Sequence, residues 1–115
     1  MQQFDIAVIG GGLVGASFAR AISGSGLRTV LIDKTPAAAL YDAALDNRGL
    51  AIAYTTQQSL HHFKLWTGLS ANSHSIAHVH VSEQGKFGFT KLSAQTCGLP
   101  ALGYVISASH LGAAL

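Results

Sequence analysis

The chain has 115 residues, at most one ordinary domain, and its low charged fraction of 10% with 49% hydrophobic residues is typical of part of a larger folded protein. Gly, Ser, Asp or His interrupts every apolar stretch, so none approaches the roughly 20 residues of a membrane-spanning helix. The net charge of +2 comes from scattered basic residues, which excludes a nucleic-acid surface of clustered cations.

The first third of the chain predicts a β-α-β unit. Residues 4–9 form a short apolar run that stops at a glycine triplet, as expected of a strand buried on both faces. Small and apolar residues over 13–23 predict a helix packed against a sheet, which Gly24 and Gly26 can end. Residues 28–33 then predict a second buried strand, at the spacing of a parallel crossover.

The middle of the chain predicts a loop followed by a helix. Residues 34–47 have no strong pattern and are expected to form the loop. Thr55 is predicted to cap the helix, since Thr55 and Gln58 match a capping box. Gly68 is expected to end it. The predicted buried stripe consists of Leu60, Phe63 and Trp66.

From Ser75 the pattern changes to a period of two and predicts a β-hairpin. Alternating apolar residues give the first strand, residues 83–86 the turn, and residues 87–92 the second strand. We interpret Phe87 and Phe89 as core residues, because no basic cluster surrounds them as it would a stacking platform.

The carboxy-terminal residues complete this pattern. Residues 93–103 are expected to form a loop, 104–106 a short strand and 110–115 the start of a helix. The sequence stops inside that helix with no stop signal, so we expect the chain to be the amino-terminal part of a longer protein.

The glycine motif gives the clearest indication of chemistry. Residues 10–15 read G-G-G-L-V-G, which is G-x-G-x-x-G between a predicted strand and a predicted helix. Gly10 would make the tight turn, Gly12 would let a pyrophosphate approach the backbone, and Gly15 would let the helix pack on the strand. The helix amino terminus offers N–H groups and a positive dipole end to phosphates.

Asp33 ends the second predicted strand, where its carboxylate can accept hydrogen bonds from ribose hydroxyls. An acidic residue here disfavours a 2′-phosphate, so FAD or NAD fits better than NADP. The alternative interpretation of the motif is a glycine turn that binds no ligand. The β-α-β unit alone does not decide between FAD and NAD.

Three segments resemble the FAD-dependent aromatic hydroxylases of ubiquinone biosynthesis. Residues 46–53, from Asp46 through Arg48, resemble the family's D-x-R-x-x-A-L segment, with Ile52 in place of Leu. The segments 78–88 and 102–112 also resemble that family, in the same order along the chain. The resemblance therefore covers most of the chain, and we infer FAD rather than NAD from it.

The resemblance implies an α/β fold, with a Rossmann-like βαβ FAD-binding part over residues 1–72. Residues 73–115 would hold the β-hairpin of a substrate domain and a return segment. It also implies that Arg48 contacts the cofactor near the pyrophosphate; the alternative is a solvated loop arginine. Together the motif and the resemblance predict these cofactor-binding residues: Gly10, Gly11, Gly12, Leu13, Val14, Gly15, Asp33, Lys34 and Arg48.

The implied activity is hydroxylation of a polyprenylated phenol by FAD with NAD(P)H and O₂. Such a substrate implies peripheral contact with the inner membrane, and the pathway implies a complex with other proteins of ubiquinone biosynthesis. The location is expected to be cytoplasmic, because Cys97 has no disulfide partner and residues 1–5 lack the basic start of a signal peptide. Two alternatives remain: part of another FAD oxidase or dehydrogenase, and a non-catalytic remnant.

Neither a metal site nor a catalytic residue is predicted. His78 and His80 share a strand face and His61 and His62 are adjacent, but no carboxylate or thiol joins either pair at ligand spacing. Cys97 has no identifiable base to activate it as a nucleophile.

Overall fold

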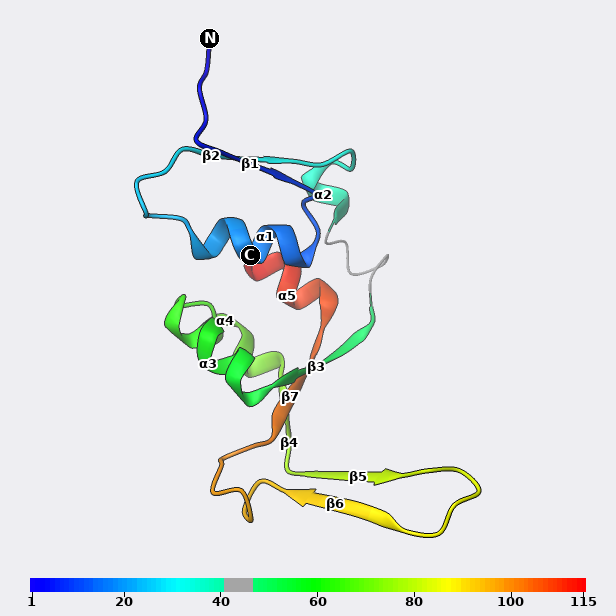
Figure 1. Ribbon diagram of the computed structural model, residues 1–115. Helices are drawn as coiled ribbons and strands as arrows, with labels where there is room; N and C mark the ends of the chain where they lie inside the picture. Colours follow the sequence, from blue (N-terminus) through cyan, green and yellow to red (C-terminus); the bar gives the residue numbers. More distant parts are fainter. Residues whose placement is uncertain (41–46) are drawn as a thin grey trace.

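The computed structural model describes residues 1–40 and 47–115 of the chain. The molecule is elongated, with extents of 63 × 29 × 27 Å. Figure 1 shows an amino-terminal βαβ unit at one end, a central sheet with helices beside it, and a hairpin that projects at the other end. Within the described ranges, no helix combines the length and the apolar content needed to cross a lipid bilayer.

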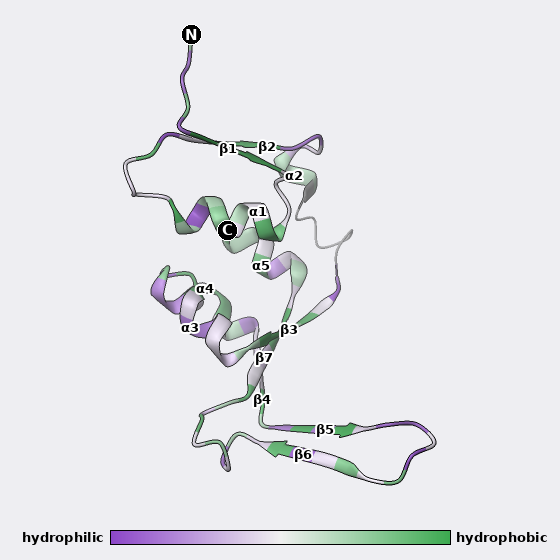
Figure 2. Ribbon diagram, viewed as in Figure 1, coloured by the Kyte–Doolittle hydropathy of each residue, from purple (hydrophilic) through white to green (hydrophobic). Residues whose placement is uncertain are grey.

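The amino-terminal unit consists of strand β1 (Ile6–Ile9), helix α1 (Leu13–Ala21) and strand β2 (Thr29–Ile32). The two strands pair in parallel, which confirms the predicted β-α-β crossover. Both strands are apolar (Figure 2). The prediction that they are buried on both faces is wrong for this chain, because a two-stranded sheet with one helix leaves Ile9 and Ile32 77% and 48% exposed.

The predicted loop after β2 contains a short helix, α2 (Ala37–Leu40), which the sequence pattern did not indicate. Residues 41–46 of that predicted loop lie outside the described part of the chain. Asp46, which belongs to the segment that resembles the hydroxylases, is among them.

The central sheet has three strands, with the order β3-β7-β4. Strand β7 pairs antiparallel with both neighbours, so that Gly103 lies opposite Ala53 on one side and Ile76 on the other. The predicted strand over 104–106 is confirmed and is the central one. The sheet consists of β3 (Gly49–Ala53), β7 (Gly103–Ser107) and β4 (His74–Ile76).

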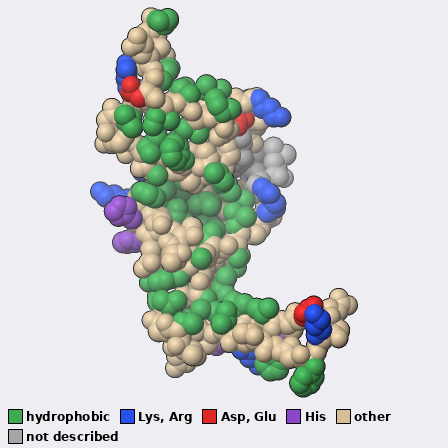
Figure 3. Space-filling model, viewed as in Figure 1, with side chains coloured by type: hydrophobic (Ala, Val, Ile, Leu, Met, Phe, Trp, Pro, Cys, Tyr) green, Lys and Arg blue, Asp and Glu red, His purple; other side chains and the backbone are tan. Residues whose placement is uncertain are grey.

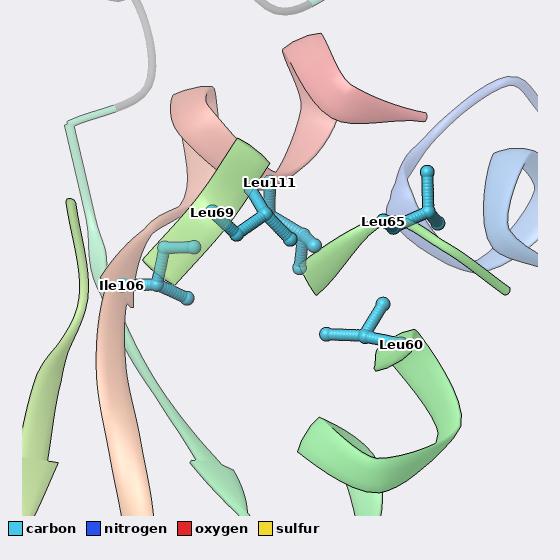
Figure 4. Packing of buried hydrophobic residues seen from close by; sticks show 5 residues of the cluster. All are labelled: Leu60, Leu65, Leu69, Ile106 and Leu111. Carbon is cyan, nitrogen blue, oxygen red and sulfur yellow. The ribbon is translucent and has the colours of Figure 1, made fainter. Parts of the chain in front are cut away.

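The largest hydrophobic cluster lies between the central sheet and the helices that follow its strands. These helices are α3 (Tyr54–His62), α4 (Trp66–Leu69) and α5 (Ala108–Ala114), and a short 3₁₀ helix, η1 (Ser70–Asn72), follows α4. Figure 4 shows the cluster's side chains pointing toward one another from α3, the segment with α4, β7 and α5. The buried members are Leu60, Leu65, Leu69, Ile106 and Leu111.

Two predicted helix boundaries are wrong. Helix α3 begins at Tyr54 rather than after a Thr55 cap, and no side chain caps it. Strand β3 runs directly into α3, and the Tyr54 N–H donates to the carbonyl of Leu102, which leaves no turn for a capping residue. The helix ends at His62, and Gly68 lies inside α4 instead of ending the predicted helix.

The predicted hairpin is confirmed as strands β5 (His78–Ser82) and β6 (Phe89–Ser93), which pair antiparallel. The interpretation of its aromatic residues as core is wrong: Phe89 is 64% exposed and Phe87 is fully exposed. The reason is the position of the hairpin, which stands apart from the helices of the central region (Figure 1).

Candidate cofactor-binding site

The turn that leaves β1 requires glycine at its first position. Gly10 has a φ of +104°, a conformation that residues with a Cβ rarely adopt. Its N–H donates to the carbonyl of Ile32 at 2.8 Å, which fixes the turn to the end of β2. The chain can therefore reverse sharply between β1 and α1 at the carboxyl edge of the two strands.

Gly15 is required by packing. A Cβ at this position would collide with the carbonyl oxygen of Gly10 and lie 3.3 Å from Cγ1 of Val8. The absence of a side chain thus lets the first turn of α1 lie directly against the end of β1. The next residue, Ala16, is buried.

Gly12 differs from both, because the fold does not require a glycine there. It is the residue before α1, with φ −65° and ψ −178°, which is extended backbone that any residue adopts. Nothing lies within 4 Å of a Cβ built on it. The open space lies at the amino terminus of α1, which has no capping side chain and no acidic residue in its first turn. A ligand phosphate that approaches the backbone closely fits this arrangement.

Asp33 links the glycine turn to the loop after β2. Its Oδ2 accepts a hydrogen bond from the Gly11 N–H at 2.6 Å, and its Oδ1 accepts one from the Thr35 N–H at 2.7 Å. The bond from Thr35 and then that from Gly11 hold the pKa of the Asp33 carboxyl below its ordinary value. The group therefore stays ionised beside the glycine turn, where it can accept further hydrogen bonds.

The predicted residues surround Gly10 in adjoining pockets. The largest, about 640 Å³, is lined by Val8, Ile9, Gly10, Gly12, Leu13, Val14, Gly15, Phe18 and Arg48. A neighbouring pocket of about 490 Å³ shares Ile9 and Gly10 with it and is completed by Ile32, Asp33 and Lys34. Gly11 lies with Asp33 in a further pocket on the side of the loop after β2.

Arg48 comes to this pocket from the far side of the molecule's centre. It directly precedes β3, and its carbonyl oxygen accepts a hydrogen bond from the Ala108 N–H at 2.9 Å. Ser107, the N-cap of α5, accepts a hydrogen bond from the His110 N–H at 3.2 Å. The start of α5 therefore holds the backbone of Arg48 in place beside α1.

Three residues that line the largest pocket were not predicted: Val8, Ile9 and Phe18. Phe18 lies one helical turn after Val14, and both side chains are exposed, at 50% and 86%. The spacing of these two apolar residues on α1 was the available signal. They give the pocket an apolar wall opposite the polar backbone of the turn.

These features fit the phosphate and ribose part of a dinucleotide such as FAD. The fit depends on the open space beside Gly12, the ionised carboxylate of Asp33 and the guanidinium of Arg48, whose fork can bind phosphate oxygens.

Comparison with known proteins gives the class. A family profile described as FAD dependent oxidoreductase matches residues 5–112. The chain therefore belongs to the FAD dependent oxidoreductase family. Its α/β architecture with the Rossmann-like βαβ unit is that of an FAD-binding domain, as predicted.

Relatives within this class include two ubiquinone hydroxylases. The chain is 37% identical over 81 residues to ubiquinone hydroxylase UbiL of Rhodospirillum rubrum, covering 70% of this chain and 19% of UbiL. It is 32% identical over 68 residues to ubiquinone hydroxylase UbiM of Neisseria meningitidis, covering 59% of this chain and 15% of UbiM. The chain thus spans about a fifth or less of the length of these relatives.

A solved structure has the same fold. It is the crystal structure of a protein from Photorhabdus luminescens subsp. laumondii assigned as an FAD containing monooxygenase. The TM-score is 0.65 with 16% sequence identity, covering 97% of this chain and 27% of the other. The fold of almost the whole chain, hairpin included, is therefore that of the corresponding part of the larger protein.

Proposed function

We propose that this chain is the FAD-binding part of an NAD(P)H- and O₂-dependent hydroxylase that acts on a polyprenylated phenol in ubiquinone biosynthesis. The names of the two ubiquinone hydroxylase relatives support this proposal. So does the order of the three sequence segments, which among such enzymes resemble those of the 2-octaprenyl-6-methoxyphenol hydroxylases.

The open space beside Gly12 is the observation that carries the proposal, because neither backbone strain nor packing explains a glycine there. The N–H groups at the start of α1, at Leu13 and Val14, would hold the pyrophosphate. The guanidinium of Arg48 would bind the same phosphates from the opposite wall. Asp33 would accept hydrogen bonds from the ribose, with Lys34 beside it.

FAD, when bound, would supply the redox chemistry of hydroxylation, in which NAD(P)H provides two electrons, one oxygen atom of O₂ enters the phenol ring and the other leaves as water. The residues of this chain would bind and orient the adenosine and phosphate end of the cofactor. We assign no catalytic role to any of them. The water-excluding enclosure that such chemistry needs would come from other parts of the enzyme.

We also propose the division into a dinucleotide-binding part, residues 1–72, and the beginning of a substrate-side part, residues 73–115. A polyprenylated substrate supports peripheral contact of a cytoplasmic enzyme with the inner membrane, and a complex with other proteins of the same pathway.

A second candidate is part of an FAD oxidase that acts on an amino-acid-like substrate. The chain is 34% identical over 73 residues to one of the polypeptides of opine oxidase from Agrobacterium tumefaciens, covering 62% of this chain and 19% of that polypeptide. The reactions of the two candidates differ in the need for NAD(P)H, which the hydroxylase consumes. The third alternative is a non-catalytic remnant.

Titration of the ¹⁵N-labelled chain with FAD tests the cofactor site directly by NMR. We expect shifts of the amide resonances of residues 10–15. Gly12→Ala is expected to weaken binding by about tenfold or more, because the added methyl group occupies the space for the phosphate. Gly68→Ala is the matched control, since nothing lies within 4 Å of a Cβ at Gly68 either. Equal affinity of the Gly12→Ala variant and the wild-type chain would contradict the proposal.

Absorbance and turnover test the rest of the proposal. We expect the 115-residue chain to lose FAD during purification and to hydroxylate nothing, because its pockets leave the flavin ring unenclosed. A fusion in which the chain replaces the matching part of R. rubrum UbiL is expected to purify yellow. A colourless fusion that is folded by circular dichroism would count against FAD binding, and an active isolated chain would overturn its description as part of an enzyme.

A further inference from the structure

Another region of interest lies at the opposite end of α1 from the glycine turn. There the carboxy-terminal ends of α1 and α3 come together around a pocket of about 240 Å³. Figure 3 shows Lys or Arg and His side chains gathered at this edge of the molecule, at the level of the ends of the two helices. The pocket is lined by Arg20, Ala21, Ser23, His62, Phe63 and Lys64.

The pocket is basic and has no acidic residue among its lining residues. The three carboxylate side chains in residues 1–40 and 47–115 are engaged elsewhere. Asp5 pairs with Arg28, Glu83 pairs with Lys86, and Asp33 accepts the two loop N–H groups. Within those ranges, no carboxylate side chain therefore neutralises the positive charges of Arg20 and Lys64.

The simplest explanation of basic residues at helix ends is attraction to the negative end of the helix dipole. That explanation suits Arg20 and His62, which lie in the last turns of their helices. The terminal carbonyls, however, already have backbone donors: the Ser23 N–H donates to Arg20 at 3.2 Å, and the Lys64 N–H donates to His61 at 3.0 Å. The side chains are therefore not needed to satisfy those carbonyls.

Lys64 is not explained by the dipole alone. It has a φ of +60°, and among the described residues it is the single non-glycine residue with a positive φ. The Leu65 N–H donates to the carbonyl of Leu60 at 2.9 Å, which completes a Schellman turn with Lys64 at its left-handed position. Glycine is the residue that adopts this position without strain. A lysine here therefore destabilises the turn while placing an ammonium group at the pocket.

Arg20 is held in position by its own helix end. Its Nη1 donates to Ser23 Oγ at 3.2 Å, and that hydroxyl donates to the Arg20 carbonyl at 2.7 Å. The fork of donors on the guanidinium is thereby anchored at one nitrogen and keeps its other N–H groups for a partner.

We propose that Arg20, His62 and Lys64 form a binding site for a phosphate-type anion, such as inorganic phosphate or a phosphate monoester. The guanidinium can bind two phosphate oxygens in parallel, the ammonium supplies a second positive charge, and the imidazole supplies an N–H donor. The volume accommodates a phosphate group with part of its carrier. This site is separate from the FAD pocket and does not rest on the proposed function.

The probe for the test is inorganic phosphate, titrated against the full chain at constant ionic strength and followed by NMR shifts of residues 20–23 and 62–64. Lys64→Gln removes the charge and is expected to weaken phosphate binding about tenfold. Lys86→Gln removes a matched charge in the hairpin turn and is expected to leave the affinity unchanged. Equal effects of the two variants, or no shift at the pocket, would overturn the proposal.

Lys64→Gly separates binding from folding, because it is expected to change the two in opposite directions. The variant should melt at a higher temperature, since glycine adopts the left-handed conformation without strain, while its affinity for phosphate falls as in Lys64→Gln. A Lys64→Gly chain that is more stable and binds phosphate as well as the wild type refutes the site. Co-sedimentation with phosphatidate vesicles, competed by free phosphate, then distinguishes a lipid headgroup from a soluble phosphate in a chain that binds.

Discussion

The glycine-rich βαβ unit and the helical core beside the central sheet differ in how well they are packed. In the core, Leu69 and Ile106 are 2% and 1% exposed. In the βαβ unit Ala16 is buried, whereas the large side chains of Ile9 and Val14 are 77% and 86% exposed. The candidate site therefore lies in the region with the least buried apolar surface, and the stability of the chain comes from a different region.

This difference means that folding and binding can be separated by mutation. Helix α5 is the link between the regions, since it contributes Leu111 to the core while the Ala108 N–H holds the carbonyl of Arg48. Changes in the core should unfold both regions. Changes on the exposed surface of the βαβ unit should affect the site while the core persists.

The largest expected effect is on the core. Ile106→Ala should lower the free energy of unfolding by about 2–5 kcal/mol, because it leaves a cavity among fully buried side chains. Ile9→Ala removes the same atoms from an exposed position and should change it by less than about 0.5 kcal/mol. Urea denaturation followed by circular dichroism measures both, and similar losses for the two variants would erase the contrast between the regions.

The next effect is confined to the βαβ unit. Gly15→Ala should destabilise it by about 1–3 kcal/mol, because the new Cβ collides with the Gly10 carbonyl and the helix must shift. Gly12→Ala should leave folding unaffected. Hydrogen exchange of the amides of β1 and α1, compared with those of α3, checks whether the loss is local. Equal protection in the Gly15→Ala variant and the wild type would mean that the close approach of helix and strand is not needed.

A smaller effect is expected from pH. The folded-state pKa of Asp33 is lowered, so its hydrogen bonds contribute stability that is fully present above the ordinary carboxyl value and is lost as the pH falls through the lower, folded value. The amide resonances of Gly11 and Thr35 should therefore titrate together in that acidic range. In Asp33→Asn this joint titration should disappear, and its persistence would assign it to another group.

The smallest effect is expected in the hairpin. Phe87→Ser should leave the free energy of unfolding within about 0.5 kcal/mol of the wild type, because the Phe87 ring is fully exposed and contributes nothing to the packed region. The same denaturation experiment measures it. A large loss would show that the hairpin packs against the rest of the chain more than the structure indicates.

The sequence predicts the elements whose causes are local. The β-α-β unit follows from an apolar run, a glycine triplet and a helical pattern within one stretch of chain. Strand β3 was not predicted, because its partner β7 lies half the chain away. Phe87 was misplaced for a related reason, since alternation identifies a strand but does not say whether another element covers it.

The candidate site divides in the same way. The roles of Gly10 and Gly15 in the turn could be read from the motif, since both are set by neighbouring backbone. Arg48 was found through the resemblance alone, because no local pattern brings it to the pocket. Phe18 was missed because its exposure depends on how α1 lies on the sheet. That these residues bind FAD remains a prediction.

The pairing of β7 with both β3 and β4 has a consequence for how the chain folds. Neither outer strand can pair until residues 103–107 are available, and Ile106 and Leu111 arrive with or just after that strand. Joining Ala53 to Gly103 closes a loop of nearly half the chain, so the entropy of closure is lost before the core contacts form. During synthesis the glycine turn can therefore form early from local sequence, while the centre of the molecule stays open until its last strand leaves the ribosome.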